Sequence, residues 1–170
     1  MKPAEAIRWM VDAVSKNGTF MLNIPGKPDG TLDSDEVAIL EAIGNWMQTN
    51  GEAIYATRPW NTFGEGPHAA KSGAFAGGST ASLDSSDIRF TRNKRGDVVY
   101  AIVLGWPAEG RFQIKSLGTA SPLRPGKVVN AALLGCVDKL QWNQSAESLT
   151  VEKPPAKLCD FAYTLRIELA

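Results

Sequence analysis

Residues 88–104 read IRFTRNKRGDVVYAIVL, and this stretch indicates how the C-terminal half of the chain folds. Two runs rich in β-branched and aromatic residues, 88–91 and 98–104, flank the segment Asn93-Lys94-Arg95-Gly96-Asp97. That segment has the composition of a hairpin turn. We predict two antiparallel strands joined by this turn.

The pattern of the hairpin continues to the end of the chain. Short runs of strand-forming residues recur at roughly ten-residue spacing, separated by turn residues such as those at 106–110. These runs cover residues 112–117, 128–134, 140–142, 149–151 and 163–169. Six or seven short strands with no helix-period segment among them predict an antiparallel β-sandwich over residues 87–170.

The first 56 residues have a different pattern. Apolar residues at spacings of three and four predict a helix over residues 3–16 and a second one that begins at Asp33 or Ser34 and ends at Asn50. Between them lies the short apolar run 19–24, which we interpret as a strand buried on both faces. One strand cannot form a sheet, so the pattern indicates that part of an α/β layer precedes this chain.

Residues 57–86 are rich in glycine, proline and serine and are predicted to connect the two parts. The expected fold class is α+β, with an N-terminal helix-strand-helix unit over 1–56, a connection over 57–86 and a sandwich over 87–170. Apolar residues make up 44% and charged residues 21%, so the chain can bury a globular core.

Charge and hydropathy exclude several partners. Eighteen basic and eighteen acidic residues cancel, which argues against nucleic acid or an anionic membrane as a partner. The longest apolar run, near 98–106, is far shorter than the roughly 20 residues that span a bilayer, so we expect a soluble protein. Residues 1–5 lack the features of a secretory signal, and the localisation stays undetermined. Two cysteines and one histidine favour neither a disulfide framework nor a metal site, and we predict no cofactor.

Several ordered motifs follow one another along the chain. In the N-terminal part these are VSKNGTFMLNIP (14–25), PDGT (28–31), IGNW (43–46) and NGEAIYATRPW (50–60). Further along, the motifs are GEGP (64–67), DIRFT (87–91), YAIVLGWP (100–107) and LLG (133–135). In this order they resemble the bacterial α-L-fucosidases of glycoside hydrolase family 29, and the resemblance covers nearly the whole chain.

The resemblance implies a fold and a parent reaction. Enzymes of this family join a (β/α)₈-like catalytic barrel to a C-terminal β-sandwich, so residues 1–60 resemble a remnant, the last stretch of that barrel. The parent reaction is hydrolysis of terminal α-L-fucosyl linkages with retention, on fucosylated glycans. The family's nucleophilic Asp and acid/base Glu lie upstream of the matched motifs, and neither can be carried onto a residue of this chain.

Three interpretations stay open from the sequence. The chain is a truncated glycosidase that acts alone or after assembly of copies, or a non-catalytic module that binds carbohydrate or supports a separate catalytic chain, or a structural fragment with no biochemical task. We also predict a homo-oligomer. Trp9, Met10, Trp46, Met47 and the run 19–24 would otherwise expose apolar surface toward a missing barrel.

Four residues are candidates for acid/base chemistry, which in a retaining glycosidase needs two carboxyl groups about 5–5.5 Å apart. Asp29 follows the predicted strand, on the side where barrel enzymes keep their sites, although Asp-Gly turn chemistry also explains it. Glu52 follows a helix end and is also suited to a backbone hydrogen bond. Glu65 and His68 lie three residues apart in a loop, where a solvated pair is the alternative to a general acid/base role.

Three tryptophans are candidates for stacking on sugars. Trp60, Trp106 and Trp142 lie in or beside the predicted sandwich and could contact carbohydrate, as aromatic rings do in sandwich-type binding modules. The alternative for Trp60 and Trp106 is packing in the core or between domains. Trp142 alternates with Leu140 and could share part of the core.

Overall fold

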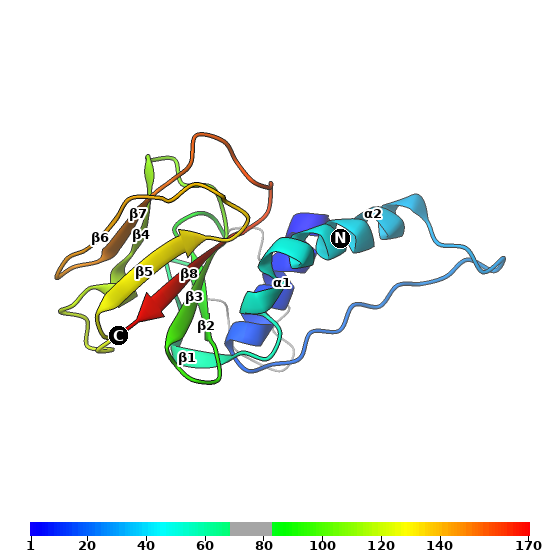
Figure 1. The fold of residues 1–170 in the computed structure, drawn as a ribbon. Helices are drawn as coiled ribbons and strands as arrows, with labels where there is room; N and C mark the ends of the chain where they lie inside the picture. The colour runs from blue at the N-terminus through cyan, green and yellow to red at the C-terminus, as the bar shows by residue number, and fades with distance from the viewer. Residues whose placement is uncertain (69–82) are drawn as a thin grey trace.

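The computed structural model describes residues 1–68 and 83–170, and Figure 1 shows their arrangement. The N-terminal elements are α1 (Pro3–Ser15), α2 (Ser34–Asn50) and the 3-10 helix η1 (Gly51–Ala53). The remaining elements are β1 (Arg58–Glu65), β2 (Ile88–Arg92), β3 (Val98–Val103), β4 (Arg111–Ile114), the 3-10 helix η3 (Lys115–Leu117), β5 (Val128–Leu133), β6 (Trp142–Gln144), β7 (Leu149–Glu152) and β8 (Tyr163–Leu169). None of the helices in the described ranges is long and apolar enough to cross a membrane.

The strands form the predicted antiparallel sandwich. One sheet has the order β1-β2-β3-β8-β5 and the other the order β4-β7-β6, and every pair is antiparallel. The β2–β3 hairpin is confirmed, with Ile88 opposite Val103. Its turn is closed by Asn93, whose side-chain oxygen accepts the backbone N–H of Gly96 at 2.8 Å. The α+β class is confirmed.

The five-stranded sheet is buried on both faces because it lies between the second sheet and the helices. All six residues of β3 are buried. Val99, Ala101 and Val103 pack into the core between the sheets. The alternate residues of β3 face the other way and pack against α1 and α2. The chain is therefore a three-layer structure rather than a sandwich with a loose N-terminal appendage.

The helices lie close to their predicted bounds, but their apolar faces are buried differently from the prediction. Met10 is 9% exposed and Trp46 is 3% exposed, so the expectation that both face a missing barrel is wrong. They pack on the outer face of the five-stranded sheet, where the Trp46 indole N–H donates to the carbonyl of Ala162 at 2.9 Å. The N-terminal part is thereby docked on the sandwich.

The predicted strand over residues 19–24 does not form. The chain leaves α1, runs out as an extended arm beyond both helices and returns to α2 (Figure 1). Met21 is 89% exposed. A strand is stabilised by hydrogen bonds to neighbouring strands, and among the described residues none lies beside the arm.

The first strand of the sheet lies inside the predicted connection 57–86. Pro59 and Gly64 make this segment look like a loop, but an edge strand tolerates both residues. The pairing of β1 with β2 shifts register between them. Trp60, midway along β1, enters the core. Residues 69–82 of the predicted connection lie outside the described residues.

Candidate functional site

The structure places Asp29 in a turn at the far end of the extended arm. Its Oδ1 accepts hydrogen bonds from the backbone N–H of Thr31 at 3.0 Å and from the Thr31 hydroxyl at 2.7 Å. The backbone hydrogen bond, followed by the hydroxyl, lowers the pKa of this exposed carboxyl. These hydrogen bonds favour the ionised form of Asp29 and explain its place in the turn.

Glu52 lies in η1, where its carboxylate pairs with Arg166 on β8. The Glu52 Oε1 to Arg166 Nε distance is 3.3 Å, and the guanidinium also binds Glu168 on the same strand. Hydrogen bonding to Glu168 is the main cause that raises the pKa of Arg166. Glu52 is therefore part of a surface charge network with two residues of β8.

Glu65 is a structural acceptor rather than a partner of His68. Its two carboxylate oxygens accept the backbone N–H groups of Lys115 at 2.8 Å and Ser116 at 2.6 Å. These N–H groups begin η3, where the first turn has no partners of its own. Glu65 thus ties the end of β1 to the other sheet, and the sequence pairing of Glu65 with His68 is not formed.

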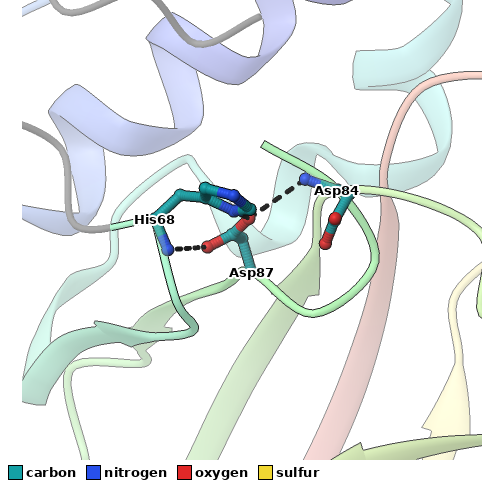
Figure 2. Close-up of side chains that lie close together, drawn as sticks. All are labelled: His68, Asp84 and Asp87. Atoms are coloured by element: carbon teal, nitrogen blue, oxygen red, sulfur yellow. Dashed lines mark hydrogen bonds and ion pairs between the residues drawn. The ribbon is translucent and has the colours of Figure 1, made fainter. Parts of the chain in front are cut away.

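His68 contacts Asp87, which no acid/base motif marks in the sequence. Figure 2 shows the buried Asp87 carboxylate between His68 and Asp84. Its Oδ1 accepts the backbone N–H of His68 at 3.1 Å, and its Oδ2 lies 2.8 Å from the imidazole Nδ1. The same Oδ2 accepts the backbone N–H of Asp84 at 3.0 Å. Asp87 therefore joins two chain segments that are sixteen residues apart in the sequence.

Gly66 leaves the space that this contact requires. Its φ of 131° lies in a region that L side chains rarely adopt. A Cβ at this position would lie 2.4 Å from Asp87 Oδ1. The signals for the Asp87 contact in the sequence are thus the GEGP and DIRFT motifs taken together.

The three residues of Figure 2 are also the group that could hold a metal ion within the described part of the chain. Their ligand atoms lie within 4.8 Å of one another. However, the Asp87 oxygens already accept three hydrogen bonds, and Asp84 Oδ1 accepts the N–H and hydroxyl of Ser86 at 2.8 and 2.5 Å. Internal hydrogen bonds account for the arrangement, and we assign no metal to it.

Asp84 and Asp87 also lack the properties of a glycosidase pair. Such a pair needs one carboxylate free to attack and one carboxyl kept protonated. Asp87 is fully buried, and hydrogen bonds from Ser86 lower the pKa of Asp84, which favours its ionised form. Asp29, Glu52 and Glu65 are each held by a separate local contact. The described residues therefore show no assembled acid/base pair.

The three tryptophans occupy different surroundings. Trp60 is 8% exposed and its ring centroid lies 4.9 Å from that of Phe90, which leaves no ring face for a sugar. Trp106 packs edge-on against Phe112 at 5.9 Å and also contacts Tyr163. Trp142 lies on the edge strand β6, half-buried against the core. Core packing thus explains Trp60, while Trp106 and Trp142 keep some exposure.

Two family models match the chain. The model of the α-L-fucosidase C-terminal domain matches residues 83–168, and the α-L-fucosidase model matches residues 1–52. Human tissue α-L-fucosidase is 29% identical over 169 residues, which cover 96% of this chain and 31% of that protein. The mouse tissue α-L-fucosidase is 30% identical over 171 residues, covering 98% and 32%. The chain spans about a third of the length of these curated relatives.

Solved structures share the fold of the whole chain. The Thermotoga maritima α-fucosidase in complex with a mechanism-based inhibitor has a TM-score of 0.73 at 23% identity, over 99% of this chain and 34% of that one. A family 29 α-L-fucosidase from Bacteroides thetaiotaomicron, solved as a trapped covalent intermediate, has a TM-score of 0.69 at 25% identity, over 98% and 32%.

Together, the sandwich, the docked helices and these matches define part of a glycoside hydrolase. The chain belongs to the α-L-fucosidase family and corresponds to its C-terminal portion. The resemblance found in the sequence motifs is confirmed.

Proposed function

We propose that this chain is the C-terminal third of an α-L-fucosidase and works in the hydrolysis of terminal α-L-fucosyl linkages with retention. In this proposal, the catalytic carboxyl groups belong to the preceding two thirds of the enzyme. The chain supplies the last strand and helices of the barrel, together with the sandwich on which they rest. Fucosylated glycans are the proposed substrates.

The extended arm between α1 and α2 is the observation that carries this proposal. Residues 19–24 are apolar and strand-forming, yet Met21 is 89% exposed. Backbone N–H and C=O groups of such a segment need partners when they are buried, and a neighbouring strand would supply them. The arm is therefore suited to enter a sheet that the rest of the enzyme provides.

Exposed apolar side chains on the neighbouring helices support the same role. Trp9 on α1 and Val37 and Leu40 on α2 are each between 37% and 41% exposed, and so is Leu32 on the arm. The opposite faces of both helices are buried against the sandwich. Each helix thus has apolar residues on both sides, as expected for a layer between the sandwich and a barrel.

An activity assay with an exchange measurement tests the proposal. The purified 170-residue chain and a hybrid that joins it to the preceding two thirds of the Thermotoga maritima relative are assayed on an aryl α-L-fucoside. We expect turnover from the hybrid and none from the chain, with amides of residues 19–24 protected from exchange only in the hybrid. Turnover by the chain alone would contradict the proposal, and so would a hybrid whose arm is protected but which is inactive.

When the chain is isolated, we propose that a second copy of it covers the exposed apolar residues of the arm and of α2. A closed dimer or small ring would bury the arm and the exposed side of α2. We expect sedimentation velocity at micromolar concentration to show such an assembly, and Leu40→Lys to shift it toward monomer. Val137→Lys is the matched control, because Val137 is fully exposed on the sandwich. A strict monomer would rule this oligomer out.

A further inference from the structure

A groove of about 500 Å³ is lined by residues of η1, of the segment that follows it and of the β2–β3 turn. Its lining includes Glu52, Tyr55, Lys94, Asp97, Tyr100 and Arg166. Neither the fold nor the proposed reaction uses it. All of its residues lie in the described part of the chain.

Tyr55 gives the groove an exposed aromatic side chain in a fixed position. The residue is 68% exposed, and its ring packs on Gly51 so closely that a Cβ there would lie 3.2 Å from it. The Tyr55 N–H donates to the Gly51 carbonyl at 2.8 Å, and Thr57 Oγ1 donates to the Ile54 carbonyl at 2.9 Å. Ala56 has a φ of 56°, which is unfavourable for alanine, so the surroundings hold this turn in place.

Polar groups beside Tyr55 come in a nearly neutral combination. Arg166 lies between two carboxylates: it forms an ion pair with Glu52 and donates a hydrogen bond from Nη1 to Glu168. Tyr100 lies on the floor of the groove, where burial is the main cause that raises the pKa of its hydroxyl, with the charge of Glu52 next. The groove thus offers donors and acceptors without a strong net charge.

These features select a class of ligand. A phosphate or sulfate would meet the cations Lys94, Arg95 and Arg166 here, but it would also meet the carboxylates of Glu52 and Asp97 in the same groove. A purely apolar ligand would leave the polar groups without partners. A neutral saccharide matches both the Tyr55 ring and the polar groups beside it. Its C–H groups pack on an aromatic ring, and its adjacent hydroxyls bind carboxylate and guanidinium groups.

We propose that the groove formed by Tyr55, Glu52 and Arg166 is a binding site for a neutral saccharide. The Tyr55 ring receives a C–H face of the sugar, while Glu52 accepts hydrogen bonds from its hydroxyls and Arg166 donates to them. This inference goes beyond the proposed function, because the site is complete on this chain and does not need the catalytic barrel.

Titration of the ¹⁵N-labelled full chain in solution tests this site. L-fucose, lactose, cellobiose and N-acetylglucosamine are added in separate titrations, with glycerol as a polyol control. We expect at least one saccharide to give saturable shifts centred on the amides of Glu52, Tyr55 and Arg95, with a dissociation constant of about 1 mM or weaker, as suits a small open site. Glycerol is expected to give none.

Two variants and a control assign the binding to the aromatic ring. Tyr55→Ala is expected to weaken binding by about tenfold, whereas Tyr55→Phe keeps the ring and most of the affinity. Phe63→Ala, at an aromatic residue that is 40% exposed outside the groove, should leave binding unchanged. The dispersed amide spectrum of each variant reports directly whether it folds.

Three results would overturn the site. The first is the absence of saturable shifts with every saccharide up to about 0.1 M, a hundredfold above a millimolar constant. The second is saccharide binding that Tyr55→Ala leaves intact, and the third is an equal response to glycerol. None of these depends on fucosidase turnover, so the failure of this site and the failure of the proposed function are distinguishable.

Discussion

The carboxylate of Asp12 on α1 binds two cations in opposite environments, which allows a buried and an exposed ion pair to be compared at one residue. Arg89 on β2 donates from Nε to Asp12 Oδ1 at 2.6 Å, and its side chain is 2% exposed. Lys16 donates to Asp12 Oδ2 at 2.8 Å, and its side chain is 30% exposed. The buried pair joins α1 to the sandwich.

We predict that Asp12→Ala destabilises the chain far more than Lys16→Ala. Removing Asp12 leaves a buried guanidinium without its counter-ion, which costs about 3–5 kcal/mol. The lower end applies, because Asp12 keeps 17% exposure and water can reach the site. Lys16→Ala removes an exposed pair and a contact over the Phe63 ring, together worth about 1 kcal/mol or less.

The double variant Asp12→Ala/Arg89→Met separates the loss of a counter-ion from a simple loss of contacts. The two explanations predict opposite changes in stability relative to Asp12→Ala. Replacing both members of a buried pair by apolar groups is often neutral or stabilising. Arg89 Nη2 has no hydrogen-bond partner within the described residues, so the charge is already incompletely satisfied. We therefore expect the double variant to be more stable than Asp12→Ala alone.

Urea unfolding followed by far-UV circular dichroism measures these differences, with free energies taken by linear extrapolation. Added salt should weaken the Lys16 contribution and leave the Arg89 contribution largely unchanged, since buried pairs are screened less. The reasoning fails if Asp12→Ala and Lys16→Ala have equal effects, or if the double variant is less stable than Asp12→Ala.

Three further predictions concern the sandwich. Burial raises the pKa of Tyr163 from 10.0 to about 12, so the folded state keeps this proton to higher pH than the unfolded state does. The free energy of unfolding should therefore be unaffected below pH 10 and fall by about 1.4 kcal/mol per pH unit up to pH 12. Tyr163→Phe should flatten this slope in urea titrations across that range, and an unchanged slope would exclude the assignment. Glu65→Gln should cost about 1–3 kcal/mol, because the amide keeps one acceptor oxygen and leaves one of the two backbone N–H groups without an acceptor; unchanged thermal melts would contradict this. A fragment of residues 57–170 should show more amide-exchange protection than one of residues 87–170, because β1 carries Trp60 into the core; equal protection would refute this.

The sandwich could be predicted because its signals are local. The β2–β3 hairpin follows from a turn segment between two apolar runs, and β8 has the predicted bounds, Tyr163–Leu169. The strand β1 was not predictable in this way, since Pro59 and Gly64 interrupt its pattern and its partner β2 is distant in the sequence. The predicted strand over 19–24 fails for the opposite reason, because its propensity is local but no strand among the described residues lies beside it.

The candidate-site residues likewise divide into those with a partner nearby in the sequence and those with a distant one. Asp29 was correctly interpreted as compatible with a turn, because its partner Thr31 is two residues away. By contrast, Glu65 binds backbone groups fifty residues away, and His68 binds Asp87 nineteen residues away. Spacing along the chain carries no information about such contacts.

The sequence by itself determined the family and the α+β class, because these depend on ordered motifs and on periodicities within single elements. Only the tertiary structure decided that Met10 and Trp46 are buried, that the arm at 19–24 pairs with no strand in the described ranges, and that Tyr55 lies beside Glu52 and Arg166. The physical reason is that burial and side-chain contacts depend on which faces of the elements meet. The periodicity of one element predicts its apolar face but not the element that packs against that face.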